Sequence, residues 1–120
     1  ALVLGVFAKQ LIEGKPMTIR GDGEQRRDFT YVGDVVNANI LASTSDKVGF
    51  GEVINIGSGN NYSVNEIANF LGGDKVFIDP VVEPFETLAD NLLAKKILNW
   101  SPSVDLSDWI VDYAKSLKVK

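Results

Sequence analysis

The sequence predicts an α/β fold in which short strands alternate with about five helices. Apolar residues recur at the helical period in several stretches, and shorter runs between them alternate apolar and polar side chains as strands do. Glycine and proline residues separate these stretches, and no repeat or low-complexity tract interrupts them. Because 120 residues is a typical length for one domain, we expect residues 1–120 to form a single domain.

The first third of the chain predicts a helix followed by a β-hairpin. Apolar residues within 4–12 lie on one helical face, and Gly14 ends the pattern. The run 17–20, MTIR, alternates as a strand does, and Asp22-Gly23 is a pair that a type I′ turn favours. We therefore expect the run 27–32, RDFTYV, to be the return strand of a hairpin.

The middle of the chain predicts two further helices with a strand between them. Asp34 has the residue type of an N-cap, and the apolar stripe that follows it predicts a helix. The run 52–57, EVINIG, predicts a strand that ends at a glycine. Ser63 and Glu66 have the spacing of a capping box, which predicts the start of a helix over 64–71.

The last third predicts one short strand and two helices. The strand is the run 75–78, KVFI, and the segment 79–86, which carries two prolines, is expected to be irregular. Asp90 is a candidate N-cap for a helix over 91–98, and Asp105 is one for the final helix.

Composition excludes several classes of function. The chain has no cysteine and no histidine, which excludes disulfides, thiolate or imidazole metal sites and Ser-His-Asp catalysis. A net charge of −4 argues against nucleic acid as a partner, because such proteins normally carry a basic face. No apolar run reaches the roughly 18 residues that a membrane span needs. Acidic residues do not show the spacing of metal ligands, so we expect no metal site. We also expect a cytoplasmic protein without a membrane site.

Two adjacent arginines, Arg26 and Arg27, are the residues best suited to bind an anion. On a strand their side chains point to opposite faces, so only one of them can enter a given pocket. A guanidinium fork matches the geometry of a phosphate and forms strong charged hydrogen bonds with it. The alternative is a pair of charges that keeps an edge strand soluble.

Three blocks of the sequence, taken together, resemble one protein family. They are FAKQLIEGKPMTIRGDGEQRRDFTYVGDVVNANILA, EVINIGSGNNYSVNEIA and TLADNLLAKKILNWSP, in this order along the chain. They resemble the C-terminal, substrate-binding part of the NAD-dependent nucleotide-sugar epimerases and dehydratases, which are extended short-chain dehydrogenase/reductases related to UDP-glucose 4-epimerase. The resemblance implies that the Rossmann half is absent from this chain. A helical pattern that starts directly after Ala1 also favours a piece of a longer protein.

The resemblance implies roles for five residues. Arg27, in the family's RDF motif, would bind the diphosphate of a nucleotide sugar. Met17, Ile19 and Arg20 would line the site of the base, which would be recognised largely through backbone groups and flat contacts. Asp90 would lie near the nucleotide ribose. From its residue type alone, capping of the next helix is the alternative for Asp90.

The sequence departs from the family pattern in the segment 79–86. Family members usually carry a second phosphate-binding arginine in this segment, but the aligned residues here are Val81 and Val82, followed by Glu83 and Phe85. Loss of one charged contact would weaken diphosphate binding by about 10- to 100-fold. A nearby carboxylate would weaken it further. Phe85 could stack on a base or sugar, although burial is the simpler role for an aromatic side chain.

The resemblance also implies which chemistry is missing. In the family, a Tyr four residues before a Lys acts as the general base, and a glycine-rich turn binds NAD(P). None of the three tyrosines here precedes a Lys at that spacing, and Gly57-Ser58-Gly59 lacks the third glycine of the dinucleotide-binding pattern. We therefore expect no catalytic and no cofactor-binding residue in this chain, and we expect the absent Rossmann half to bind NAD.

The sequence thus predicts the nucleotide-sugar binding part of an NAD(P)-dependent epimerase or dehydratase that is inactive by itself. Its partners would be a nucleotide-diphosphate sugar and the missing Rossmann half. One alternative is a stand-alone, non-enzymatic module that binds a nucleotide or a protein. Another is a fragment that self-associates through apolar residues of the first helix and of the run 35–42, VVNANILA.

Overall fold

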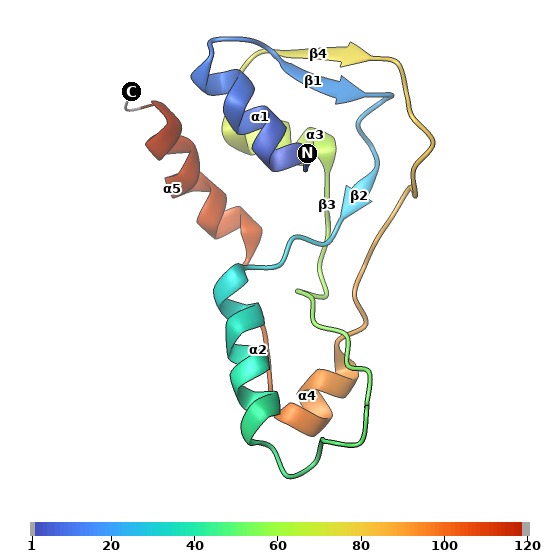
Figure 1. Cartoon of the computed structure of the whole chain (residues 1–120). Coiled ribbons are helices and arrows are strands. Elements are labelled where there is room, and N and C mark those ends of the chain that lie inside the picture. The colour runs from blue at the N-terminus through green and yellow to red at the C-terminus, as the bar shows by residue number, and fades with distance from the viewer. Residues whose placement is uncertain (1, 119–120) are drawn as a thin grey trace. The chain divides into compact units, whose positions relative to one another are not determined.

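The computed structural model describes residues 2–118, and the chain divides into two compact units. The first unit contains three segments: the residues up to Arg27, Tyr62–Glu86, and the residues from Ser107 onward. The second unit contains Asp28–Asn61 and Thr87–Leu106. Five helices joined by a few short strands make up the described part of the chain, which confirms the predicted α/β class (Figure 1). A single domain over residues 1–120 stays a prediction.

The first unit is built around a pair of parallel strands. β1 (Met17–Arg20) pairs in parallel with β4 (Lys75–Ile78), with Met17 opposite Lys75 and Arg20 opposite Ile78. The helix α1 (Val3–Ile12) precedes β1 in the chain and packs on it. The later helix α3 (Val64–Leu71) also packs on β1. Figure 1 shows α1 and α3 beneath the two strands. The predicted helix over residues 4–12 and both of these strands are therefore confirmed.

The predicted hairpin, with β1 as its first strand and 27–32 as its second, is wrong. The next strand, β2, covers only Arg26–Arg27 and pairs antiparallel with β3 (Tyr62–Ser63). The chain does turn at Gly23, whose φ is 76°. The Asn65 side chain then donates a 2.9 Å hydrogen bond to the backbone oxygen that precedes Gly23. This bond connects the turn to the start of α3, and β1 pairs with β4 instead of with the chain that follows the turn.

The start of α3 confirms the predicted capping box. The Ser63 hydroxyl accepts a hydrogen bond from the backbone N–H of Glu66 at 3.1 Å, and the Glu66 carboxylate accepts one from the backbone N–H of Ser63 at 2.7 Å. The helix ends at Gly72, which adopts the left-handed conformation with φ 71°. Reciprocal capping satisfies two N–H groups that the first turn of a helix otherwise leaves without partners.

The core of the first unit joins side chains from helices and strands. Its largest fully buried members are Phe7, Met17, Ile19, Ile67, Leu71 and Ile110. The last of these lies on α5 (Leu106–Lys118). Full burial of an aliphatic or aromatic side chain of this size stabilises a fold by about 1.5–3 kcal/mol. The alternation of β1 therefore directs Met17 and Ile19 into the core, while Arg20 is exposed.

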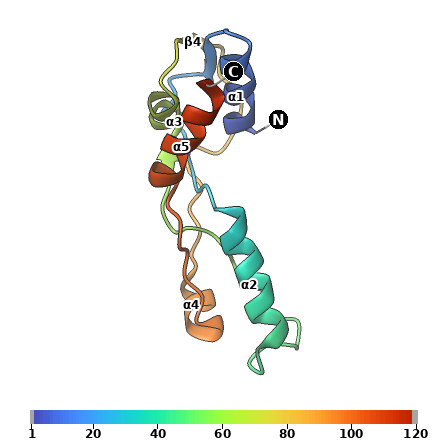
Figure 2. The same cartoon turned by 90° about the vertical axis from the view of Figure 1, so that its left-hand side faces the viewer.

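The second unit has a smaller core between two helices. These helices are α2 (Val32–Thr44) and α4 (Leu92–Leu98), which contact each other and can be followed in Figure 2. The buried side chains between them are Ala38, Ala94, Leu98 and Trp100. The indole Nε1–H of Trp100 donates a 2.9 Å hydrogen bond to the backbone oxygen of Asp34, so the largest core side chain has its polar atom satisfied.

Asp34 is not the N-cap of α2, contrary to the prediction. The helix begins at Val32 with Tyr31 as its N-cap, so Asp34 lies in the first turn and is buried. Its carboxylate accepts hydrogen bonds from the backbone N–H and hydroxyl of Ser103 and from the backbone N–H of Val104. A carboxylate with these three donors is not available to cap the helix.

The predicted strand over residues 52–57 is also wrong. The structure assigns no strand there, although Ile54 and Ile56 pack on the core of the second unit while Val53 is exposed. The sequence alternation is thus reflected in burial. A strand, however, also needs a neighbouring strand for its backbone hydrogen bonds, and the described residues of this unit supply none.

Candidate functional site

Arg27 has a half-buried guanidinium group whose position is fixed by neighbouring oxygens. Its Nη1 donates hydrogen bonds to the backbone oxygens of Arg26 at 2.7 Å and Phe85 at 3.4 Å. Its Nη2 lies 3.7 Å from the Oε2 of Glu83. The Arg27 side chain is 24% exposed, so solvent still reaches part of the group. A cation with a carboxylate at one terminal nitrogen has the chemistry of an anion-binding site.

Arg26 and Arg27 are separated, as the strand alternation predicts. Arg26 lies on the other side of β2, where its Nη2 is 3.4 Å from the Oε2 of Glu66. Glu66 is also the capping residue of α3, so this pair connects β2 to the start of that helix. Both arginines thus face a glutamate, and what distinguishes Arg27 is its place in the RDF motif. Arg27 remains the candidate for anion binding.

The three residues expected to line a base site differ in accessibility. The side chains of Met17 and Ile19 are fully buried in the core of the first unit. Arg20 is exposed, and its Nη1 donates a 3.3 Å hydrogen bond to the backbone oxygen of Asp79. Of the three, only Arg20 presents its side chain at the surface of this unit. A role for Met17 and Ile19 in base recognition stays a prediction that would depend on backbone atoms.

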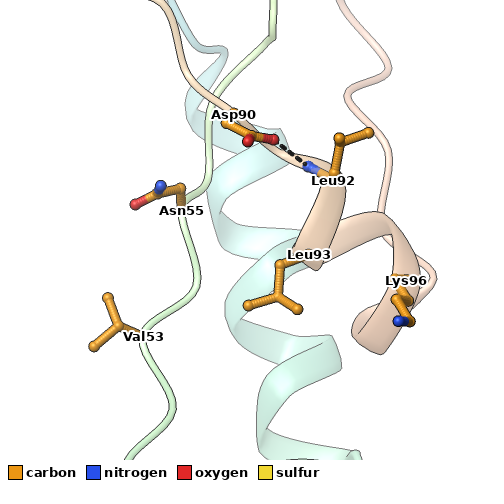
Figure 3. A pocket seen from close by; sticks show the side chains of 6 residues that line it. All are labelled: Val53, Asn55, Asp90, Leu92, Leu93 and Lys96. Atoms are coloured by element: carbon orange, nitrogen blue, oxygen red, sulfur yellow. Dashed lines mark hydrogen bonds between the residues drawn. The ribbon is translucent and has the colours of Figure 1, made fainter.

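Asp90 lies in the second unit, directly before α4. The N-cap of this helix is Asn91, but the Asp90 carboxylate accepts a 3.1 Å hydrogen bond from the backbone N–H of Leu92 (Figure 3). Asp90 thus satisfies one of the first N–H groups of the helix, close to the capping role that its residue type suggests. Its role near a ribose stays a prediction.

Asp90 also lines a shallow hollow of about 330 Å³ in the second unit. The lining residues are Val53, Asn55, Asp90, Leu92, Leu93 and Lys96. Figure 3 shows Val53 and Asn55 on the segment that faces α4, and the Leu93 side chain extends from α4 toward that segment. The lining combines three polar side chains, those of Asn55, Asp90 and Lys96, with three apolar ones, and none of its residues is an arginine.

Sequence reasoning missed Asp28, which joins three segments of the second unit. Its Oδ1 accepts hydrogen bonds from the backbone N–H of Ser58 at 3.0 Å and from the Ser58 hydroxyl at 2.6 Å. Its Oδ2 accepts from the backbone N–H groups of Gly59 at 2.9 Å and Ala89 at 3.2 Å. The only sequence signal is its position directly after Arg27, which does not reveal donors 30 or more residues away.

The turn at Gly57-Ser58-Gly59 does not fit the phosphates of NAD. A dinucleotide-binding turn directs free backbone N–H groups at the cofactor's pyrophosphate. Here the N–H groups of Ser58 and Gly59 donate to the Asp28 carboxylate. A Cβ at Gly57 would collide with Ala89, so this glycine is required by close packing within the unit. We assign no step of cofactor chemistry to this turn.

Two opposing effects determine the pKa of Asp34. Burial raises it, because desolvation disfavours the charged form. Hydrogen bonds from the Ser103 hydroxyl, the Ser103 N–H and the Val104 N–H lower it, and together they outweigh burial. The net result is a pKa below the usual value, so Asp34 is ionised at neutral pH. Its charge is compensated by donors of its own chain.

Neither a metal nor a membrane-spanning site is visible in the part of the chain that the structure describes. Residues 2–118 hold no group of three or more potential metal-ligating His, Cys, Asp or Glu side chains. Within the same range, no helix combines the length and the apolar character needed to cross a bilayer.

Comparisons with known proteins identify the family. The sequence model of the NAD dependent epimerase/dehydratase family matches residues 2–57. The chain is 34% identical to UDP-glucuronate 4-epimerase of Thermodesulfobacterium geofontis over 131 aligned residues, which cover 94% of this chain and 40% of that protein. It is 30% identical to UDP-glucose 4-epimerase of Mycolicibacterium smegmatis over 115 residues, which cover 90% of this chain and 36% of that protein.

A solved structure gives the same result. The fold matches UDP-glucuronic acid 4-epimerase from Bacillus cereus in complex with UDP-glucuronic acid and NAD, with a TM-score of 0.83 and 37% sequence identity. The match covers 97% of this chain and 40% of that one. The curated relatives are likewise longer, since this chain spans 35–40% of their length. The chain belongs to the NAD-dependent epimerase/dehydratase family and corresponds to part of the length of its members.

Proposed function

We propose that this chain is the C-terminal, substrate-binding part of an NAD-dependent nucleotide-sugar epimerase or dehydratase, and that Arg27 binds the substrate's diphosphate. The observation that carries the proposal is the guanidinium of Arg27, which is half-buried, held by two backbone oxygens and paired with a carboxylate. The printed names of the relatives support a nucleotide sugar as the ligand, because they act on UDP-glucuronate or UDP-glucose.

In this proposal, residues 1–120 act as one substrate-binding domain and do no bond chemistry. Arg27 supplies a fixed positive charge, and the exposed Arg20 with the backbone of β1 supplies contacts to the base. Binding energy from the nucleotide then orients the sugar for a reaction carried out by residues outside this chain. NAD supplies hydride acceptance in such a reaction when it is bound. We expect no epimerase or dehydratase turnover from the isolated chain.

The test compares two charge-conserving substitutions. Arg27→Lys and Arg26→Lys both keep one positive charge and remove one guanidinium fork. Calorimetric titration with UDP-glucuronic acid should show a roughly 10-fold or greater loss of affinity for Arg27→Lys and little change for Arg26→Lys, because a charged hydrogen bond contributes about 1.5–3 kcal/mol. Equal affinities of the two variants would contradict the proposed role of Arg27.

A second part of the proposal concerns the partner of α2. Val32, Val36 and Ile40 follow one another at the i, i+4 spacing and are 71%, 52% and 57% exposed. Residues at this spacing lie on one face of a helix. We propose that this face contacts the part of the enzyme that lies outside this chain. In the isolated chain the same face would favour self-association.

Sedimentation velocity tests the α2 face. The unmodified chain should sediment faster as its concentration rises, whereas Val36→Glu with Ile40→Glu should sediment as a monomer at every concentration. Monomeric behaviour of the unmodified chain would count against self-association. The stand-alone, non-enzymatic module is the alternative function. A start codon directly before the Ala1 codon would favour this alternative, whereas an open reading frame that continues upstream would oppose it.

A further inference from the structure

The carboxylate beside Arg27 comes from a segment that is far away in the sequence. Glu83 lies in the irregular segment between β4 and α4, and its Oε2 is 3.7 Å from the Nη2 of Arg27. The two side chains are 34% and 24% exposed, respectively, so neither is sealed from solvent. Both residues belong to the first unit, so the contact is part of its internal geometry.

The guanidinium of Arg27 has one terminal nitrogen facing the protein and one facing this carboxylate. Nη1 is occupied by the backbone oxygens of Arg26 and Phe85. Nη2 is the terminal nitrogen that faces Glu83. Carboxylate and phosphate oxygens are equivalent partners for a guanidinium, because both are anionic acceptors with matching geometry. Glu83 therefore stands where a phosphate oxygen of a ligand would be bound.

The segment that carries Glu83 does not need this ion pair to stay in place. The backbone N–H of Arg26 donates a 2.7 Å hydrogen bond to the backbone oxygen of Phe85, which fixes the segment through its main chain. Val82, next to Glu83, is fully exposed, so no apolar packing of this neighbour holds the carboxylate against Arg27. The hydrogen bond of the main chain therefore does not depend on the position of the Glu83 carboxylate.

We propose that Glu83 is an internal competitor for the anion position of Arg27 and that it sets the affinity of this site for phosphate groups. The proposal rests on the proposed function, in which Arg27 binds the diphosphate. A ligand must displace the Glu83 carboxylate before its phosphate reaches Nη2. It must also bring its own negative charge close to that carboxylate. Both effects weaken binding, and both disappear when Glu83 is neutral.

The test uses Glu83→Gln in the full 120-residue chain. Glutamine keeps the size of the side chain and removes its charge. Asp74→Asn is the matched control, since it removes one negative charge from the same unit at an exposed residue whose carboxylate has no hydrogen bond to the described residues. Thermal unfolding followed by circular dichroism confirms that both variants are folded.

Two probes are titrated into each protein: inorganic pyrophosphate and UDP. Binding is followed by calorimetry and by the NMR signals of the arginine Nε–H groups. The chain has only three arginines, Arg20, Arg26 and Arg27, so these signals are few, and Arg27→Lys identifies the signal of interest. We expect Glu83→Gln to bind both probes about three- to tenfold more tightly than the unmodified chain. Asp74→Asn should equal the unmodified chain.

The outcomes separate this proposal from the proposed function. Tighter pyrophosphate binding by Glu83→Gln, with no UDP binding by any variant, supports the competitor and contradicts the nucleotide function. UDP binding that is lost in Arg27→Lys but unchanged in Glu83→Gln supports the function and overturns the competitor. Equal tightening by Asp74→Asn, weaker binding by Glu83→Gln, or no pyrophosphate response at Arg27 in any variant would each overturn the competitor.

Discussion

Asp34 and Glu83 are both carboxylates, but their surroundings differ. Asp34, in the second unit, is buried and receives three hydrogen bonds from Ser103 and Val104. Glu83, in the first unit, is one-third exposed and faces a single cation at 3.7 Å. The donors of Asp34 are amide and hydroxyl groups that bind its carboxylate inside the unit. The partner of Glu83 is a partly exposed guanidinium, for which an anion from solution can compete. Burial and the number of donors thus distinguish the carboxylate of Asp34 from that of Glu83 at the proposed binding site.

The largest effect is expected at Asp34. Asp34→Ala leaves two backbone N–H groups and one hydroxyl without their acceptor, which should lower the free energy of unfolding by about 2–4 kcal/mol. Asp34→Asn keeps one acceptor oxygen and should lose less. Urea denaturation followed by tryptophan fluorescence measures both, and Trp109→Phe as a background leaves Trp100 as the reporter of the second unit. Equal stability of the alanine variant and the parent would contradict the structural role.

The pH dependence of stability should reveal the same residue. The folded-state pKa of Asp34 lies below its ordinary value of 3.8. A carboxyl with a lowered folded-state pKa stabilises the fold fully above its unfolded-state pKa, and this stability is lost as the pH falls through the folded-state value. The urea midpoint should therefore fall as the pH drops below about 4, and it should fall less steeply in Asp34→Asn. Parallel slopes in the two proteins would show that Asp34 has no lowered pKa.

Asp28 should have the next largest effect. Its carboxylate accepts from Ser58, Gly59 and Ala89, but it is only half-buried. Water can replace part of what Asp28→Ala removes, so we expect a loss of about 1–3 kcal/mol. Hydrogen exchange of the amides of Gly59 and Ala89 gives a local measurement, and both should exchange faster in the variant. Unchanged protection of these two amides would contradict the hydrogen bonds.

Substitution of two separate glycines, Gly23 and the control Gly5, tests the turn that leads to the arginines. Gly23 has φ 76°, and an added Cβ would collide with the Asn65 side chain. Gly23→Ala should therefore lower stability by about 1–2 kcal/mol. Gly5 is the control, because it lies inside α1 with no atom near its added Cβ. Gly5→Ala should raise stability by about 0.5–1 kcal/mol. Thermal unfolding compares the two, and a stabilising Gly23→Ala would show that the turn has another conformation.

Local sequence signals predicted the helices better than they predicted the pairing of strands. The capping box of Ser63 and Glu66 is confirmed, since both of its hydrogen bonds link residues three apart. β1 pairs with β4 across more than 50 residues of chain, and no residue near the predicted turn carries that information. The hairpin failed because the Asp22-Gly23 turn was used to infer a strand pairing. The strand at 52–57 failed because the pattern of apolar residues does not supply a neighbouring strand. Alternation predicts which side chains are buried, but it does not predict the neighbouring strand.

The candidate site was predictable to a similar degree. Arg27 could be chosen over Arg26 through the family resemblance, and the structure places the two arginines with different carboxylates. The contact between Arg27 and Glu83 could not be predicted, because 79–86 has no regular structure from which its side-chain directions follow. Asp34 shows the same limit: its residue type indicated a helix cap, while its donors, Ser103 and Val104, lie about 70 residues further along the chain.

The smallest effect on stability is expected at Glu83, although its substitution should change phosphate binding. Glu83→Gln removes one partly exposed ion pair, and such pairs contribute at most about 1 kcal/mol, so the free energy of unfolding should change by less than that. Asp34→Asn makes the same chemical change at the buried carboxylate and should cost several times more. Urea denaturation of both variants under one buffer condition gives the comparison. A loss at Glu83 as large as the loss at Asp34 would mean that the pair with Arg27 holds the fold together. In that case the Glu83 carboxylate could not leave Arg27 for a phosphate without unfolding the segment that carries it.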